Sequence, residues 1–247
     1  MAFDVGKWHG RVLSTPATYS RLVDLAEHPP VVAEYKRSFS VQTLDERGSL
    51  VALDAGRLDE QIREAIYGDA LSAIDHYSSL MVVTAATYIE NIILEFLIVY
   101  FTAKPQSIHA HLMPGSSKRE EAYVPLREVL AASSLSELHC QLARRAARNA
   151  SDGSIKKTLD RVSRLTGHCV PISVAVPISE IVLLRNSIVH EGRSLTKEAA
   201  AIEERFSSVY ALLRELALIC KAEGLPYVDE GGLVDPPSLN EIELLVP

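Results

Sequence analysis

The sequence predicts a mostly α-helical protein with a small β-containing N-terminal extension. From Leu58 onward, apolar residues recur every three or four positions, the period of a helix face. Turn-forming and β-favouring segments are concentrated in the first 57 residues. The chain has 247 residues, of which 47% are hydrophobic and 23% are charged, as in ordinary globular proteins. This length allows one large core, or a small domain plus an extension.

Residues 1–57 combine turn residues with two short runs that favour β-structure. These runs are residues 38–41 and residues 49–53, and Asp45-Glu46-Arg47-Gly48 lies between them. A turn-forming segment between two such runs predicts a hairpin. We therefore assign residues 1–57 to an N-terminal α/β extension.

The helical body is expected to begin at Leu58. Its first apolar positions recur at threes and fours up to Leu80, and the most apolar stretch of the chain follows, at residues 80–103. That stretch is long enough to cross a membrane, but Glu90 and Glu95 lie near its middle, where a carboxylate in lipid costs several kcal/mol. We interpret it as a buried helix and expect no membrane partner.

Three further helices are predicted from caps and periodicity. Ser134 followed by Glu137 is a capping-box pattern, and residues 152–154 separate the second helix from the first. The third has a candidate cap at Thr196 and the clearest periodicity of the chain. Its apolar positions are Ile202, Phe206, Val209, Leu213, Leu216 and Cys220. Residues 58–224 thus form the helical domain, and residues 225–247, with five acidic residues and no basic one, form an acidic extended tail.

Several classes of protein are excluded by the number and spacing of the cysteines, by the N-terminal segment and by motifs that do not occur. Three widely spaced cysteines without a C-x-x-C pair argue against a disulfide framework or a cysteine zinc site. The first residues lack the basic and apolar regions of a secretory signal, so a cytoplasmic protein is expected. Dinucleotide, P-loop, zincin and α/β-hydrolase motifs do not occur. The segment 115–119 resembles a phosphate loop in composition alone and is expected to be a linker.

Histidine pairs are the only candidates for a metal site. They are His109 with His111, His139 with Cys140, and His168 with Cys169. None has a paired carboxylate at a familiar spacing, so we expect neither a metal nor a cofactor. A metallohydrolase built on His109 and His111 stays as a third hypothesis, and chelation would abolish its activity.

One late segment carries the strongest functional pattern. Pro177 is typical of a first helical turn and Gly192 of the position just after a helix, so a helix of about four turns is expected between them. Arg185, Asn186 and His190 fall in its last turn and a half. Asn186 and His190 are about 40° apart around the helix axis, and Arg185 is long enough to reach them, so the three groups can converge.

The same helix has apolar residues on two faces. Ile181, Leu184 and Ile188 form one stripe, whereas Val182 and Val189 line the side that carries the polar groups. A second apolar face predicts a second partner. A homodimer in which this helix packs against its copy would bring two Arg/Asn/His sets into a shared cleft.

The segment Arg185-Asn186-Ser187-Ile188-Val189-His190 resembles the motif of the HEPN superfamily. Ribonucleases of that superfamily are small helical proteins with an Arg-x(4 to 6)-His motif near the end of a late helix, often with Asn directly after the Arg. The resemblance covers residues 58–224 and implies a HEPN-like helical bundle. HEPN toxins that are neutralised by adenylylation carry a Tyr two residues after the His. Gly192 stands there in this chain, so that mode of regulation is not expected.

The resemblance implies metal-independent cleavage of RNA by 2′-hydroxyl transesterification. His190 would be the general acid or base, because imidazole titrates near neutral pH. Arg185 would bind the phosphate and stabilise the transition state, and Asn186 would position His190 or the phosphate. Glu180 and Glu90 are candidates to orient these groups, or carboxylates that pair with Arg185.

A basic segment offers a track for RNA although the whole chain has a net charge of −7. It lies between residues 144 and 164, where seven basic and two acidic residues give a local charge of +5. The basic residues are Arg144, Arg145, Arg148, Lys156, Lys157, Arg161 and Arg164. Such an asymmetry can guide a polyanion to one face, and the alternative is a solvated helical surface.

Together these features predict a HEPN-type endoribonuclease that acts in stress, toxin–antitoxin or antiviral defence biology. An antitoxin, another regulatory protein or the acidic tail would restrain it. The alternative is a non-catalytic HEPN-like helical interaction protein. In that case Arg185 and His190 simply complement the negative end of the helix dipole.

Overall fold

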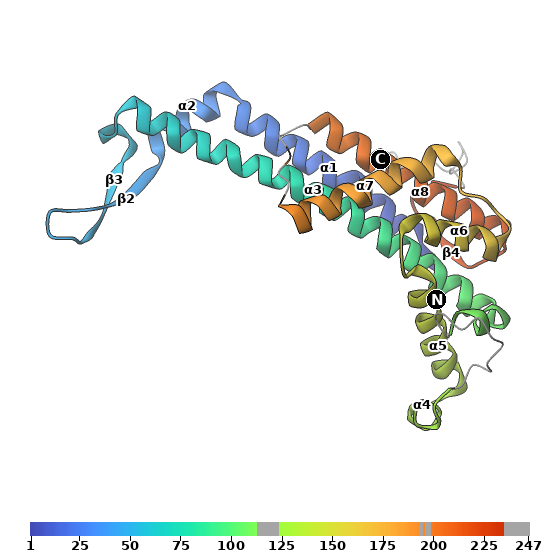
Figure 1. The fold of residues 1–247 in the computed structure, drawn as a ribbon. Coiled ribbons are helices and arrows are strands. Elements are labelled where there is room, and N and C mark those ends of the chain that lie inside the picture. Colours follow the sequence, from blue (N-terminus) through green and yellow to red (C-terminus); the bar gives the residue numbers. More distant parts are fainter. Residues whose placement is uncertain (113–123, 193–194, 196–198, 235–247) are drawn as a thin grey trace, which may run out of the picture.

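The computed structural model describes residues 1–112, 124–192, 195 and 199–234 and confirms a mostly α-helical fold with a small N-terminal β part (Figure 1). The helices are α1 (Val5–Glu27), α2 (Pro29–Ser38), α3 (Glu60–Ala103), α4 (Leu126–Ala131), α5 (Leu135–Ser151), α6 (Ile155–Thr166), α7 (Ile172–Glu191) and α8 (Ala199–Ala222), with three short 3-10 turns. The strands are β1 (Phe3–Asp4), β2 (Ser40–Leu44), β3 (Leu50–Asp54) and β4 (Tyr227–Val228).

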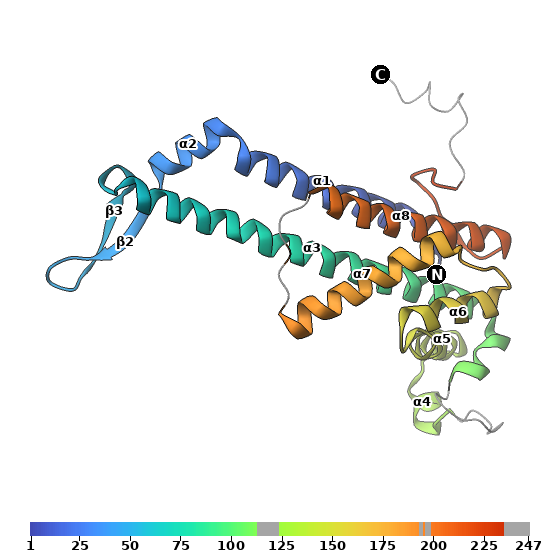
Figure 2. The same cartoon turned by 45° about the horizontal axis from the view of Figure 1, so that its top comes forward.

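Helix α3 is the axis of the fold. It is one continuous helix of 44 residues that covers both the periodic and the very apolar part of the sequence. Its second half is buried, with Ile89, Phe96 and Phe101 fully enclosed. Helices α1, α5, α7 and α8 pack against it, and Figures 1 and 2 show α1, α7 and α8 along α3 and the pair α5–α6 at one end. The six apolar positions predicted for the last helix are all buried in α8.

The N-terminal segment contains a long helix that the sequence pattern does not predict. Helix α1 packs against α8 and α3 and buries Trp8, Val12 and Tyr19 in the common core. Trp8 Nε1 donates a hydrogen bond to Glu95 Oε2 of α3 at 2.9 Å. Residues 5–27 therefore share the core of the helical body. Pro16, inside α1, masks the helical pattern because proline is typical of turns and of helix starts.

Residues 225–234 return to the N-terminus. Strand β4 pairs in parallel with β1, and Leu225 is buried. The carboxylate of Asp229 accepts hydrogen bonds from the backbone N–H groups of Leu233 and Val234 at 2.9 and 2.8 Å. This first part of the predicted extended tail is thus packed, and residues 235–247 lie outside the described part of the chain.

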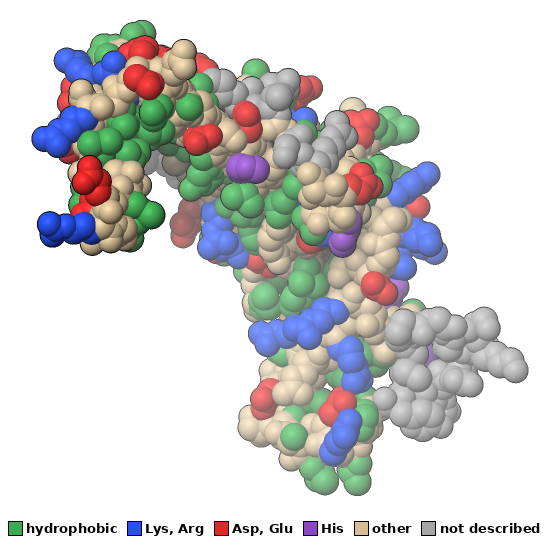
Figure 3. All heavy atoms as spheres, turned by 60° about the vertical axis from the view of Figure 1, so that its left-hand side comes forward, with side chains coloured by type: hydrophobic (Ala, Val, Ile, Leu, Met, Phe, Trp, Pro, Cys, Tyr) green, Lys and Arg blue, Asp and Glu red, His purple; other side chains and the backbone are tan. Residues whose placement is uncertain are grey.

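The hairpin predicted around residues 45–48 is confirmed. Strands β2 and β3 are antiparallel, with Ser40 opposite Asp54 and Leu44 opposite Leu50. At the turn, Asp45 Oδ1 accepts from the backbone N–H groups of Arg47 and Ser49 at 2.8 Å. The hairpin extends beyond the helical body (Figure 1), and its residues are mostly exposed. In Figure 3 hydrophobic side chains gather at this end of the molecule.

Two serine caps fix the start of α5 and α6. Ser134 Oγ accepts from the backbone N–H of Glu137 at 3.1 Å, as the capping-box pattern predicts. The Glu137 carboxylate, however, accepts from the backbone N–H and hydroxyl of Ser133, not from the backbone of Ser134. Ser154 caps α6 in the same way as Ser134 caps α5. The candidate cap Thr196 lies outside the described residues.

Candidate functional site

Helix α7 carries the Arg/Asn/His motif and is longer than the sequence predicts. It begins at Ile172, after Pro171, and Pro177 lies inside it, so the expected start at Pro177 is wrong. The N–H that proline lacks would have bonded within the second turn, and the neighbouring backbone bonds are enough to continue the helix. The predicted end is confirmed, because Gly192 adopts a left-handed φ of 67° just after Glu191.

Arg185 is held by Glu90 of α3. Its Nη2 donates a short hydrogen bond to Glu90 Oε1 and forms an ion pair with it. The Arg185 side chain is 25% exposed and the Glu90 side chain 51% exposed, so the pair lies at the surface between α3 and α7. Arg185 Nε is buried and has no hydrogen-bond partner among the described residues. The Nε donor is therefore enclosed, and another acceptor can reach this guanidinium only through the exposed part of the side chain.

Asn186 and His190 are both exposed near the end of α7. They are one turn apart, a spacing that places side chains on the same face, about 5–6 Å between Cβ atoms. Within the described part of the chain, no side chain forms a hydrogen bond with either of them. Solvent or a second molecule therefore has direct access to both.

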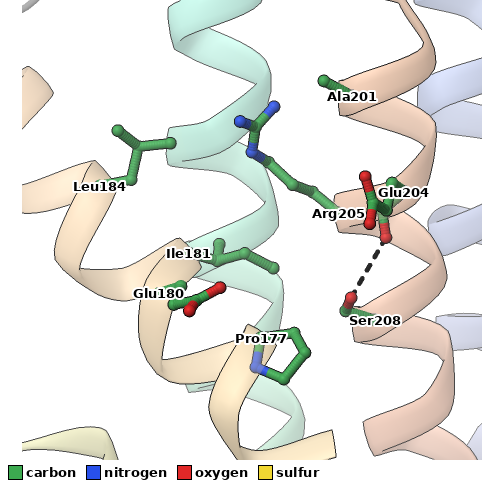
Figure 4. A pocket seen from close by; sticks show the side chains of 8 residues that line it. All are labelled: Pro177, Glu180, Ile181, Leu184, Ala201, Glu204, Arg205 and Ser208. Atoms are coloured by element: carbon green, nitrogen blue, oxygen red, sulfur yellow. Dashed lines mark hydrogen bonds between the residues drawn. The ribbon is translucent and has the colours of Figure 1, made fainter. Parts of the chain in front are cut away.

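Glu180 does not join this group. It lies on the side of α7 that faces α8, in a cleft that it shares with Arg205, Glu204 and Ser208 of α8 (Figure 4). Five residues separate Glu180 from Arg185, which corresponds to about 140° around a helix. Of the two carboxylates predicted to support the motif, the structure brings Glu90 to Arg185 and leaves Glu180 in the α7–α8 cleft.

Helix α7 carries an exposed stripe of three apolar and three polar residues, which includes Asn186 and His190 of the motif. The positions recur with steps of four and three and are Ile172, Val176, Ser179, Leu183, Asn186 and His190. Ile172 is 79% exposed, Val176 48% and Leu183 67%. We call these six residues the α7 stripe. Alternating steps of four and three are typical of a helix seam that packs against another helix.

The other faces of α7 agree with the sequence analysis in part. Ile181 is buried, and Leu184 and Ile188 are half-buried against the core. Val182 is half-buried beside Glu90, and Val189 is 55% exposed. The second apolar face therefore exists, but it is formed mainly by the α7 stripe.

Both α3 and α7 are long and apolar enough to span a membrane by length and composition alone. The most apolar 18-residue window of α3 has a mean hydropathy of 1.7 and is 50% buried. The corresponding window of α7 has a mean hydropathy of 1.6 and is 17% buried. Core helices of soluble proteins pass the same test, so the finding is weak evidence for a membrane protein. Three residues of α7 are buried, eight are half-buried and nine are exposed, so one face of the helix stays open to solvent in the single chain.

The seven basic residues predicted to bind RNA fall into two groups. Arg145 Nη1 donates to both carboxylate oxygens of Glu128, at 3.0 and 3.2 Å, and Arg161 donates to the backbone carbonyls of Ala150 and Asp152. These two arginines hold α4 and α6 in place. The other five, Arg144, Arg148, Lys156, Lys157 and Arg164, are exposed. Figure 3 shows Lys and Arg side chains over its lower part, where α4 and α5 lie.

The histidines form no metal site in the described part of the chain. The ring of His111 packs on Phe101, with 5.3 Å between centroids, and burial, with Arg161 and Arg164 nearby, lowers its pKa. His168 bonds to Glu223 at 3.1 Å, while Cys169 is exposed. Nothing therefore brings the three predicted pairs together. The expected linker at residues 115–119 lies outside the described residues.

Comparison of the chain with protein-family models, curated proteins and solved structures gives no match.

Proposed function

We propose that this chain is a metal-independent endoribonuclease of the HEPN type that works as a homodimer. The observation that carries the proposal is the position of the motif. Asn186 and His190 belong to the exposed α7 stripe, and the Arg185 side chain, beside them, is 25% exposed. A helix pairing through this stripe would bury its apolar residues and bring two copies of the motif together.

The residue types suit transesterification of RNA. The 2′-oxygen attacks the adjacent phosphorus, the bond from phosphorus to the 5′-oxygen breaks, and the products are a 2′,3′-cyclic phosphate and a 5′-hydroxyl. His190 takes the proton of the attacking hydroxyl or supplies one to the leaving oxygen. Arg185 stabilises the charge that develops on the phosphoryl oxygens. Glu90 holds the Arg185 side chain over α3 until a phosphate competes for it.

Four exposed cations, Arg144, Arg148, Lys156 and Lys157, provide favourable charge for the rest of the strand. Uncontrolled RNA cleavage harms the cell that carries it. A stress, toxin–antitoxin or antiviral defence role in the cytoplasm, with a regulatory protein partner, fits this activity.

A specific observation favours a second candidate, a non-catalytic helical interaction protein. Arg185 is already paired with Glu90, and no described residue hydrogen-bonds to His190 to fix its ring. A general acid or base is normally oriented by such a partner. In this alternative the α7 stripe binds another protein.

Cleavage of a mixed RNA pool in EDTA tests the proposal. We expect wild type to produce cyclic or 3′-phosphate ends and His190→Ala to produce none. His76→Ala, which removes an exposed histidine of α3, is the matched control and keeps full activity. Circular dichroism verifies equal folding of the three proteins. Equal products from wild type and His190→Ala would contradict the proposal and favour the interaction protein.

A further inference from the structure

A cavity of about 310 Å³ adjoins the Arg185–Glu90 pair. It lies between α3, the α5–α6 connection, α6 and α7. Glu90 forms part of its wall, and so does Val182, which precedes Arg185 by three residues on α7. A ligand whose phosphate is bound by Arg185 therefore has this cavity directly beside it.

The walls of the cavity contain apolar side chains and polar side chains that can accept hydrogen bonds. Ile93, fully buried, and Leu94 line the α3 side, and Ile155 lines the α6 side. Asn91 stands on the same wall as Glu90, and its Nδ2 donates to the carbonyl of Thr87 at 2.9 Å. The Asn91 Oδ1 atom accepts no hydrogen bond from the described residues. A flat ring with apolar faces and a donor on its edge matches this lining.

The α5–α6 corner forms a rigid wall of the cavity. Ser151 and Gly153 belong to this corner, and Thr158 Oγ1 donates to the carbonyls of Ser151 and Ser154 at 3.2 and 3.3 Å. Arg161 donates to the carbonyl of Ala150 at 2.8 Å. Three hydrogen bonds from two side chains thus hold the corner before any ligand binds, which lowers the entropic cost of binding.

A lysine side chain lies at this corner of the cavity. The Lys157 side chain lies over Gly153, with its Cδ atom 4.0 Å from the position that a Cβ would take there. The first turn of α6 contains Lys156 and Lys157 and no acidic residue. Cations at a helix N-terminus oppose the helix dipole, so this arrangement is unfavourable until an anion neutralises it.

We propose that the cavity binds the base of the nucleotide next to the scissile phosphate. One phosphate lies on Arg185 and the following phosphate lies near Lys157 at the start of α6. The two acceptors, Glu90 and Asn91 Oδ1, are satisfied by the two N–H hydrogens of an exocyclic amino group and not by the single N3–H of uracil, so adenine, cytosine and guanine bind better than uracil. This inference rests on the proposed function and adds a base preference that the sequence does not indicate.

Binding of 3′-phosphorylated dinucleotides whose first sugar is 2′-deoxyribose tests the inference without cleavage, because these carry both phosphates and no attacking hydroxyl. Isothermal titration with the four possible second bases, which lie between the two phosphates, is expected to rank uracil lowest. Val182→Phe fills the cavity and is expected to weaken binding of all four about tenfold, a loss typical of one displaced base. Asn91→Leu, at an exposed position, is expected to remove the ranking. Lys157→Gln is expected to weaken binding a few-fold without changing the ranking of the bases.

Matched controls separate the cavity from general effects on charge or folding. Val51→Phe places the same bulk on the hairpin and is expected to bind like wild type. Lys156→Gln removes the neighbouring charge on α6 and is expected to lose less affinity than Lys157→Gln. Unchanged affinity and ranking in Val182→Phe and Asn91→Leu would overturn the inference, even if wild type cleaves RNA. Dinucleotide binding that these variants weaken, in a wild type that cleaves nothing, would support the cavity and contradict the nuclease. Absence of any binding by wild type would overturn the inference.

Discussion

Replacement of Leu183 by Asp tests whether the α7 stripe is a dimer interface. Leu183 is 67% exposed in the single chain, so about two thirds of its side chain is available for burial by a partner. Full burial of a leucine stabilises by about 1.5–3 kcal/mol, which leaves about 1–2 kcal/mol per copy. A two-fold interface loses this contribution twice, about 2–4 kcal/mol in total. The dimer dissociation constant should therefore rise about 30- to 1000-fold, before the repulsion between the introduced carboxylates is counted.

Sedimentation equilibrium over a series of concentrations measures this constant directly. Leu135→Asp is the matched control, because Leu135 is 82% exposed at the start of α5 and lies outside the α7 stripe. We expect wild type and Leu135→Asp to dimerise equally and Leu183→Asp to be monomeric over most of the range. A wild-type monomer at every concentration, or a Leu183→Asp dimer as tight as wild type, would refute the role of the stripe.

Three other predictions concern single side chains. Glu90→Gln removes a surface ion pair of about 0.5–1 kcal/mol and frees Arg185 for phosphate, so anisotropy should show about two- to fivefold tighter binding of uncleavable RNA. Unchanged or weaker binding would show that Glu90 does not compete with phosphate. The hydrogen bond from Lys104 lowers the folded-state pKa of Glu223, so the stabilisation is present above the ordinary carboxyl pKa and is lost as pH falls through the folded-state pKa. Melting temperatures from pH 7 to acid should accordingly converge for wild type and Glu223→Gln, and parallel curves would contradict this. Burial raises the pKa of Cys220 to about 12, so a thiol reagent near neutral pH should label it only after unfolding, unlike the two other cysteines.

The sequence predicts best those features that depend on neighbouring residues. The α8 face, the hairpin turn at Asp45 and the Ser134 cap are all encoded within a few positions and are all present. Helix α1 is missed because Pro16 interrupts its pattern and because its partner α8 is about 190 residues away in the chain. Such a contact leaves no local signal.

In the candidate site, too, features set by nearby residues can be predicted, whereas contacts between distant segments cannot. The end of α7 at Gly192 and the shared face of Asn186 and His190 follow from spacing alone. The partnership of Arg185 with Glu90 joins residues 95 positions apart, and it depends on how α3 and α7 cross. Glu180, in contrast, could have been separated from Arg185 by helical geometry, because five residues turn the chain about 140°.

The length of α3 has a mechanical consequence. An unbroken helix of 44 residues is about 66 Å long; it contains no proline, and its backbone hydrogen bonds run on past Gly68 and resist sharp bending. The hairpin β2–β3 lies near the start of this helix (Figure 2), and Glu90, with Arg185 attached, lies in its second half. The helix therefore keeps the distance between the hairpin and the Arg185–Glu90 pair constant. Whatever the hairpin touches is held at a constant distance from the arginine.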